Sequence, residues 1–169
     1  ETLKPPGRES FRVEGPRELR MIEASGRTVE AMFSDQQWYQ PERSRFDYWR
    51  WSRGAAEVVL RNPHPFSVMT DIAFDLKSSD ERKVVVRAVP KATADAKGVV
   101  LWSGETVHTL RGVLVSGVRL PPGDTVWKFE TDKAAQFPSN GDPRKVAFSL
   151  RNMEIRIMAK VPVGETGKP

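Results

Sequence analysis

The sequence lacks cysteine altogether and contains only two histidines among its 169 residues. Without cysteine the chain cannot contain disulfide bonds, thiol nucleophiles or cysteine-ligated zinc. No apolar run reaches the length of about 18 residues that a membrane-spanning helix needs. Neither the Gly-x-Ser-x-Gly motif of a nucleophile elbow nor a glycine-rich phosphate-binding loop occurs. We therefore expect no enzymatic activity, no cofactor and no metal site.

The formal net charge of +5 is small, and basic residues are mixed with acidic ones, as in residues 77–83. Proteins that bind nucleic acid more often gather their basic residues into a stripe or an arm. The arginine of the Trp49-Arg50-Trp51 cluster does not change this view, because alternate residues of a strand point to opposite faces. We expect no nucleic-acid partner, and a solvated surface that can face an anionic membrane or polymer.

Most of the chain from residue 46 onward alternates between apolar and polar residues, which is typical of half-buried β-strands. The clearest case is residues 67–76, where Val68, Ile72 and Leu76 share one face and Asp71 and Asp75 share the other. The expected strands are residues 19–24, 28–33, 46–52, 56–61, 67–76, 83–89, 98–102, 106–110, 113–120, 125–129 and 146–158. Residues 103–105 are expected to form a hairpin turn between two of them.

The last expected strand changes parity. Apolar residues occupy even positions from 146 to 150 and odd positions from 153 to 157. One extra residue near Arg151-Asn152, a β-bulge, would produce this change. A break into two separate strands would produce it as well.

This pattern of short strands predicts an all-β fold. No amphipathic helix of a dozen residues is visible after residue 46, so parallel strands with helical crossovers are not expected. We predict an antiparallel two-sheet β-sandwich that is jelly-roll-like, with an immunoglobulin-like sandwich as the alternative. The sandwich is expected to cover residues 17–160, after an irregular N-terminal segment (1–16) and before a C-terminal tail or linker (161–169).

The aromatic residues are the best candidates for function. A sugar ring has apolar C–H faces and a rim of hydroxyl groups, so an exposed aromatic ring beside planar polar side chains suits it. The candidate ligand-binding residues are Gln36, Gln37, Trp38, Tyr39 and Trp49. The alternative for Trp38 is that it caps an open end of the sandwich. The tryptophans on strands are expected to pack in the core, although one of Tyr48 and Trp49 must face outward. On this reading, Trp38→Ala would abolish glycan binding.

The ionisable residues do not suggest catalysis or metal binding. Asp71 and Asp75 would lie ~13 Å apart at ~3.3 Å per residue, which is too far for the paired carboxylates of a glycosidase. His64 stands between two prolines and His108 on an expected strand, without the neighbours of a catalytic triad. The Asn-Gly-Asp-Pro sequence at residues 140–143 is typical of a turn rather than of a calcium loop.

A family resemblance rests on short motifs in a fixed order. They are Trp38-Tyr39, Trp49-Arg50-Trp51-Ser52, Glu57-Val58-Val59-Leu60-Arg61-Asn62-Pro63, Val100-Leu101-Trp102-Ser103-Gly104-Glu105, Leu120-Pro121-Pro122-Gly123-Asp124 and Phe129-Glu130-Thr131-Asp132. In this order, over residues 36–157, the sequence resembles β-sandwich domains attached to polytopic bacterial envelope proteins, including membrane glycosyltransferases. Those domains in turn resemble jelly-roll carbohydrate-binding modules.

The resemblance implies an extracytoplasmic setting, in the periplasm or at the cell surface, and supplies no catalytic residues. The expected partners are a glycan or cell-envelope polymer and a membrane-bound parent or partner protein. The expected function is therefore a non-catalytic module that contacts glycan. The alternative is a structural or protein-interaction domain of a larger membrane-associated protein, with no small ligand.

Overall fold

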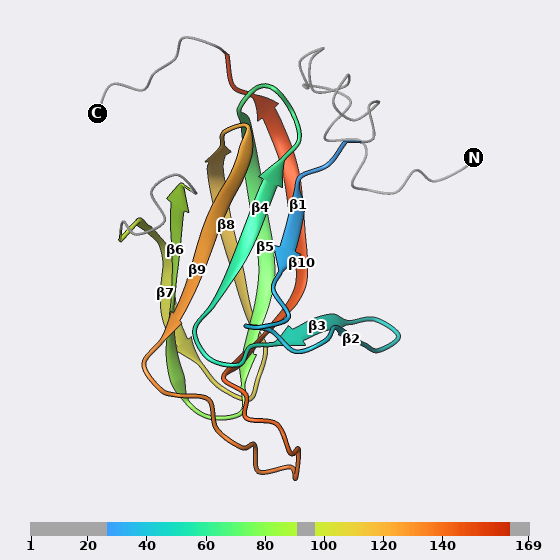
Figure 1. The fold of residues 1–169 in the computed structure, drawn as a ribbon, viewed down its shortest axis with the longest axis vertical. Coiled ribbons are helices and arrows are strands. Elements are labelled where there is room, and N and C mark those ends of the chain that lie inside the picture. Colours follow the sequence, from blue (N-terminus) through green and yellow to red (C-terminus); the bar gives the residue numbers. More distant parts are fainter. Residues whose placement is uncertain (1–26, 91–96, 163–169) are drawn as a thin grey trace, which may run out of the picture.

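The computed structural model describes residues 27–90 and 97–162, which form two five-stranded antiparallel sheets packed face to face (Figure 1). The first, here called the β4–β9 sheet, has the order β1 (Glu30–Phe33), β4 (Ala56–Asn62), β9 (Gly123–Thr131), β6 (Arg82–Pro90) and β7 (Val99–Thr106). The second, the β5–β10 sheet, has the order β2 (Glu42–Arg43), β3 (Tyr48–Trp51), β10 (Phe148–Lys160), β5 (Val68–Ser78) and β8 (Arg111–Leu120).

The strand pairing is nested. Strand β3 pairs with β10, β4 with β9, β5 with β8, and β6 with β7. Pairing from the outside inward in this way is the arrangement of a long hairpin rolled into two sheets, which is the jelly roll. The predicted all-β antiparallel sandwich is confirmed, and of its two forms the jelly roll is the one observed.

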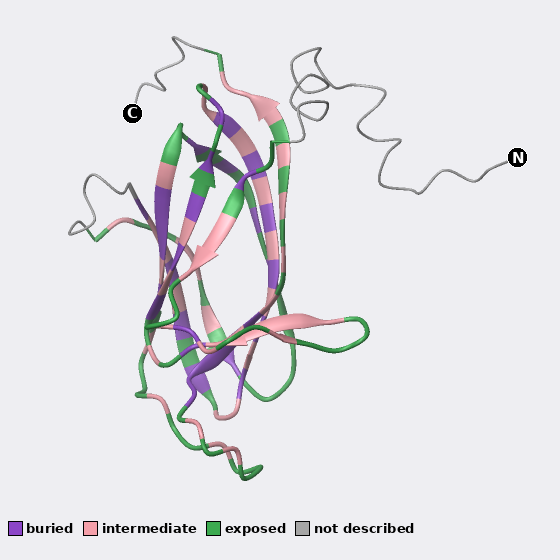
Figure 2. Cartoon of the chain, turned by 45° about the vertical axis from the view of Figure 1, so that its right-hand side comes forward, coloured by how far each residue is buried: buried purple, intermediate pink, exposed green. Residues whose placement is uncertain are grey.

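The core lies between the two sheets and follows the alternation of the strands. Along β5 every second residue is buried and the others are half-buried (Figure 2). Aromatic rings from both sheets meet at the centre, where Phe129 lies 5.8 Å from Phe74, 6.2 Å from Trp38 and 6.0 Å from Phe148 between ring centroids. Such ring contacts stabilise the core beyond the apolar area that they bury.

The expected hairpin turn at residues 103–105 is wrong. Strand β7 continues through it, with Ser103 and Gly104 paired to β6, and the turn follows at residues 107–110. Gly104 is needed for close packing rather than for a turn, because a Cβ placed there would lie 2.7 Å from the ring of Trp102. The expected strand over residues 19–24 and the expected irregular segment 1–16 lie outside the described residues.

The parity change in the last strand is a β-bulge. Strand β10 is continuous, and its pairing with β5 shifts between Arg151 and Glu154. Asn152, within the shift, has a φ of 53°, a left-handed conformation that asparagine tolerates better than most residues. Its side chain accepts a hydrogen bond from the backbone N–H of Tyr48 and donates one to Asp47, both at 2.9 Å. The bulge is thereby fixed to the start of β3.

Two fully buried tryptophans provide a matched test of the core. The Nε1–H of Trp38 donates to the carbonyl of Glu57 at 2.9 Å, whereas the Nε1–H of Trp127 has no acceptor among the described residues. Trp→Phe removes the same atoms at both sites, but only at position 38 does it break a hydrogen bond. We expect Trp38→Phe to lower the free energy of unfolding by about 1–2 kcal/mol more than Trp127→Phe, measured by urea denaturation. Equal losses would show that the Trp38 hydrogen bond contributes nothing net.

Candidate functional site

One row of residues crosses all five strands of the β5–β10 sheet. Strand register places these residues directly opposite one another, in the order Glu42, Trp49, Arg151, Asp75 and Gly112. The next row inward along the strands contains Leu150 and Leu76, which are both in the core. Because successive residues of a strand point to opposite faces, the row from Glu42 to Gly112 lies on the outer face of the sheet.

A second row on the same face contains Trp51, Ser149 and Lys77. Trp51 is half-buried, and its ring makes no aromatic or cation–π contact with the described residues. Lys77 makes no hydrogen bond or ion pair through its ammonium group within the described ranges. The outer face therefore carries two tryptophans two residues apart, and the ring of Trp51 has no stacking partner.

Trp49 is held in place by polar neighbours. Its Nε1–H donates to Glu42 at 2.7 Å, and the Arg151 guanidinium lies 4.5 Å from its ring centroid. The Nε of Arg151 in turn donates to the Ser149 hydroxyl at 3.1 Å. Partial burial lowers the pKa of Arg151, and the nearby carboxylates of Asp47, Glu42 and Asp75 only partly oppose this effect. The guanidinium is thus a positioned cation in a partly desolvated place.

Tyr39 joins this network through Arg144. Arg144 donates to Glu42 at 2.6 Å and to Asp142 at 2.7 Å, and its guanidinium lies 5.1 Å from the Tyr39 ring centroid. Arg53 lies over the same ring at 4.0 Å. The Tyr39 hydroxyl donates to the backbone carbonyl of residue 145. A continuous chain of contacts therefore links Tyr39 to Trp49.

The ion pair between Arg144 and Asp142 changes the pKa of both groups. Hydrogen bonds from the Arg144 side chain and backbone lower the pKa of Asp142 to about 2. The hydrogen bond to Asp142 raises the pKa of Arg144, and Glu42 adds to the effect. Both groups stay charged over the physiological pH range. Because Arg144 is already paired with Asp142 and Glu42, we assign this ion pair a structural role rather than a role in ligand binding.

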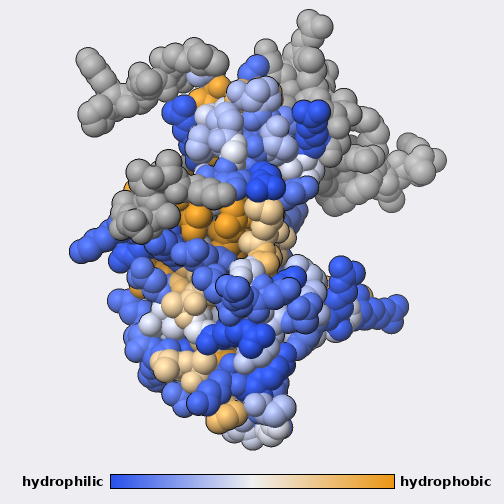
Figure 3. Space-filling model, viewed as in Figure 1, coloured by the Kyte–Doolittle hydropathy of each residue, from blue (hydrophilic) through white to orange (hydrophobic). Residues whose placement is uncertain are grey.

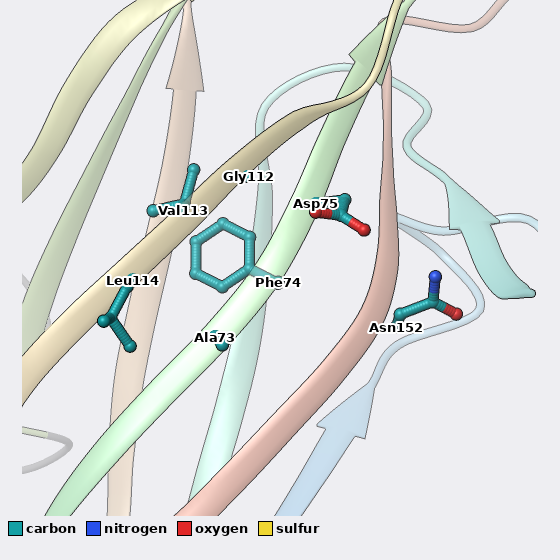
Figure 4. Close-up of a pocket in the computed structure, with 7 residues that line it drawn as sticks. All are labelled: Ala73, Phe74, Asp75, Gly112, Val113, Leu114 and Asn152. Carbon is teal, nitrogen blue, oxygen red and sulfur yellow. The ribbon is translucent and has the colours of Figure 1, made fainter.

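A shallow cavity of about 330 Å³ opens beside the first row. It is lined by Ala73, Phe74, Asp75, Gly112, Val113, Leu114 and Asn152 (Figure 4). Figure 4 shows these residues coming from β5, β8 and the bulge of β10. Asp75 supplies a carboxylate that accepts no hydrogen bond from a described residue, and Leu114 supplies an exposed apolar side chain. The volume is at the lower end of the range for small-ligand sites.

The structure separates the predicted site residues into two groups. Trp38 is fully buried and packs edge-on against Phe33 and Phe148, so the capping alternative describes it and the exposed-ring expectation is wrong. Gln37 is tied to the core strand β4 through Glu57, and Gln36 is exposed in the adjoining turn. Trp38→Ala would therefore test the core rather than a ligand site. Tyr39 and Trp49 remain candidates, since both lie on or beside the outer face.

Trp51 is the residue that the sequence reasoning missed. It was expected in the core together with the other strand tryptophans. The parity argument already contained the signal, because Trp49 and Trp51 must share a face while Arg50 takes the opposite one. The register confirms this arrangement: Arg50 lies opposite the core residue Leu150, and its guanidinium packs over Phe33.

The other ionisable candidates have structural surroundings. His64 is buried, stacks on Phe66 at 5.0 Å and makes a ring-nitrogen contact with the carbonyl of residue 27. His108 is exposed in the turn after β7 rather than on a strand. Asp71 accepts a hydrogen bond from the backbone N–H of Gly117. Within residues 27–90 and 97–162, no group of three potential metal ligands gathers in one place.

Comparison with known proteins gives matches only among solved structures, and these matches are distant. No protein-family model and no curated protein sequence matches the chain. A family 29 carbohydrate-binding module complexed with cellulohexaose is 12% identical over 78% of this chain and 92% of that one, with a TM-score of 0.41. A family 4 carbohydrate-binding module is 5% identical over 76% and 86%, with a TM-score of 0.43.

A third match is a Podospora anserina GH26-CBM35 β-(1,4)-mannanase, which is 9% identical with a TM-score of 0.41. The match covers 80% of this chain but only 27% of the mannanase. Similarity this distant carries no functional argument, so the residues of the chain itself must supply one. Separately, the part of the chain that the structure describes contains no helix suited to crossing a lipid bilayer.

The Asp142–Arg144 pair predicts a measurable titration. Because the folded-state pKa of Asp142 is lowered from 3.8 to about 2, the stability that the pair contributes is fully present above pH 3.8 and is lost as the pH falls through about 2. Carboxyl NMR of the wild-type chain should show Asp142 titrating near pH 2. In Arg144→Gln the same carboxyl should titrate at a higher pH that is still below its ordinary value, because the backbone N–H of residue 144 continues to donate to it. A wild-type midpoint near pH 4 would mean that the pair is not formed in solution.

Proposed function

We propose that this chain is a non-catalytic module that binds a glycan on the outer face of its β5–β10 sheet. The observation that carries the proposal is the pair Trp49 and Trp51, both half-buried and both on this face. An indole ring that is partly exposed can stack against the C–H face of a sugar, and the Trp51 ring has no other stacking partner among the described residues. Rings buried in the core, such as Trp38, have no such access.

Polar groups around the tryptophans suit the hydroxyl rim of a sugar. Lys77 lies in the row of Trp51, and the Nη atoms of Arg151 make no hydrogen bond to the described residues. Asp75 adds an acceptor at the edge of the cavity. A mainly apolar surface with a few well-placed donors and acceptors is the usual composition of a small-ligand site.

The carboxylates of this face are not arranged for glycoside hydrolysis. Glu42 and Asp75 lie three strand spacings apart, or about 14 Å between Cα atoms, in a row that Trp49 and Arg151 occupy between them. Glycosidases place their two carboxyl groups roughly 5–9.5 Å apart. Glu42 is also engaged by two donors, Trp49 and Arg144. The arrangement therefore supports binding without cleavage.

The proposal extends to the setting of the module. The family resemblance of the sequence supports an extracytoplasmic location and attachment to, or association with, a membrane-bound protein. The ligand would then be a glycan or polymer of the cell envelope.

A protein-interaction function has a separate observation in its favour. Strand β7 forms one edge of the β4–β9 sheet, and its Val99 and Val100 are 68% and 49% exposed. Unpaired strand edges with exposed apolar side chains can accept another strand. This edge lies apart from the tryptophan rows, so the two functions can be tested separately.

Substitution of the outward tryptophans tests glycan binding. We expect a glycan array followed by isothermal titration to identify a ligand, and Trp51→Ala to weaken its binding by about 2 kcal/mol, or roughly thirtyfold, as loss of a central aromatic contact does. Trp49→Ala should weaken it as well. Phe46→Ala, which removes an aromatic side chain that is 84% exposed at the tip of the β2–β3 connection, should leave affinity within twofold. An array without any ligand, or full binding by folded Trp51→Ala, would refute the proposed site.

A further inference from the structure

We infer that the glycan bound by this face carries carboxylate or sulfate groups, and that Arg151 and Arg53 bind them. This inference rests on the proposed glycan-binding function and specifies the class of ligand. Both guanidinium groups lie over aromatic rings of the same site, Trp49 and Tyr39. A stacked guanidinium keeps the edge of its plane available, and that edge matches the two oxygens of a carboxylate or sulfate.

Arg151 is prepared for such an anion. Its Nε is fixed by the Ser149 hydroxyl at 3.1 Å and its plane by the Trp49 ring at 4.5 Å. The two Nη atoms make no hydrogen bond to the described residues. Because these donors are already oriented, little side-chain freedom remains to be lost when an anion binds.

The nearby carboxylates do not neutralise Arg151 by direct contact. Glu42 already accepts from Trp49 and Arg144, and Asp47 accepts from Asn152. Asp75 lies opposite on β5 but forms no ion pair with Arg151. Partial burial destabilises the charged form and so lowers the pKa of Arg151. A bound oxyanion would supply the close counter-charge that the described chain does not.

Arg53 supplies a second cation at the Tyr39 end of the face. It is exposed, stacks on Tyr39 at 4.0 Å and forms no side-chain hydrogen bond or ion pair with the described residues. Arg144, on the same ring, differs because it is already paired with Asp142 and Glu42. The hydroxyl of Tyr39 is fixed by a backbone carbonyl, so the ring is a stable support for Arg53.

Hydrogen-bond donors that remain unused on this face favour an anionic ligand. Three cations on this face, Arg53, Arg151 and Lys77, form no ion pair with the described residues. The acidic groups are mostly engaged, because Asp71 accepts from a backbone N–H and Glu154 pairs with an arginine two residues on. Asp75 is the one carboxylate among the rows described that accepts no hydrogen bond. Unused cationic donors on this face therefore outnumber unused carboxylate acceptors, which favours an anionic ligand.

The outer face of the β4–β9 sheet gives a contrast. Its arginines are paired across strands, Arg61 with Asp124 at 2.8 Å and Arg87 with Glu130 at 3.2 Å. The register places Val59 and Val126 side by side between these charged rows. Figure 3 shows this side of the molecule, with a limited hydrophobic area among hydrophilic residues. These two arginines are thus ion-paired, whereas Arg53 and Arg151 beside the tryptophan rows are not.

Matched pairs of polysaccharides test the inference. The probes are polygalacturonate against its carboxyl-reduced neutral form, and dextran sulfate against dextran, measured by isothermal titration at low and high salt. We expect the wild-type chain to bind at least one acidic polymer about tenfold more tightly than its neutral partner, which is the effect of one or two charge-assisted hydrogen bonds. Arg151→Gln should remove most of this preference. Arg87→Gln, which removes the same charge from the other sheet, should keep it.

Each other result would overturn the inference in a distinguishable way. Equal binding of acidic and neutral polymers would leave glycan binding standing and reject the anionic ligand. An equal loss in Arg87→Gln would indicate general charge attraction. Arg151-dependent binding to vesicles of anionic lipid, without binding to acidic polymers, would identify a headgroup instead. If Arg151→Gln loses the fold, Arg53→Gln at its exposed position carries the test, with an expected loss of about threefold or more. Failure of every polymer and array glycan would reject the proposed function itself.

Discussion

The structure depends on a β-bulge that absorbs one extra residue in strand β10. Up to Leu150 the even-numbered residues of this strand face the core, and from Met153 onward the odd-numbered ones do. Asn152 takes up the difference in a left-handed conformation, and its amide is bonded to the start of β3. Because β10 lies between β3 and β5, the bulge sets the parity of the strand at the centre of its sheet. Without it, the apolar residues of one half of β10 would point into solvent.

The same bulge arranges the candidate ligand face. It ends the regular pairing just after Arg151, where that residue lies opposite Trp49 on one side and Asp75 on the other. The bond from Asn152 to the backbone of Tyr48 fixes β3 in the register that brings Trp49 under the guanidinium. Fold and proposed function are therefore linked: the device that lets β10 complete the core also places a cation, an aromatic ring and a carboxylate in one row.

The sequence predicted the alternation well, and burial less well. Strand β5 and the parity change in β10 were both visible, because a period of two is a local property of the chain. Which face of β3 is buried is not local, since it depends on the sheet packed against it. For that reason Trp51 was expected inside and Trp38 was considered for the outside, and the structure shows the reverse. Gly104 was expected in a turn because glycine is common in turns. Its observed role is to leave room for the ring of Trp102 on the same strand, and that role depends on the orientation of a side chain that the sequence pattern does not show.

Removal of the bulge residue is the most direct test of this account. Urea denaturation of a chain lacking Asn152 should still be cooperative, because the deletion removes the odd residue and leaves Leu150, Met153 and Ile155 in uninterrupted alternation on the core face. Asn152→Gly keeps the residue count and the left-handed backbone, so it should fold and lose only about 1–3 kcal/mol with its side-chain hydrogen bonds. Loss of cooperative unfolding in the deletion variant, beside a folded Asn152→Gly, would contradict the claim that the bulge absorbs one residue and so keeps the apolar residues of β10 on the core face.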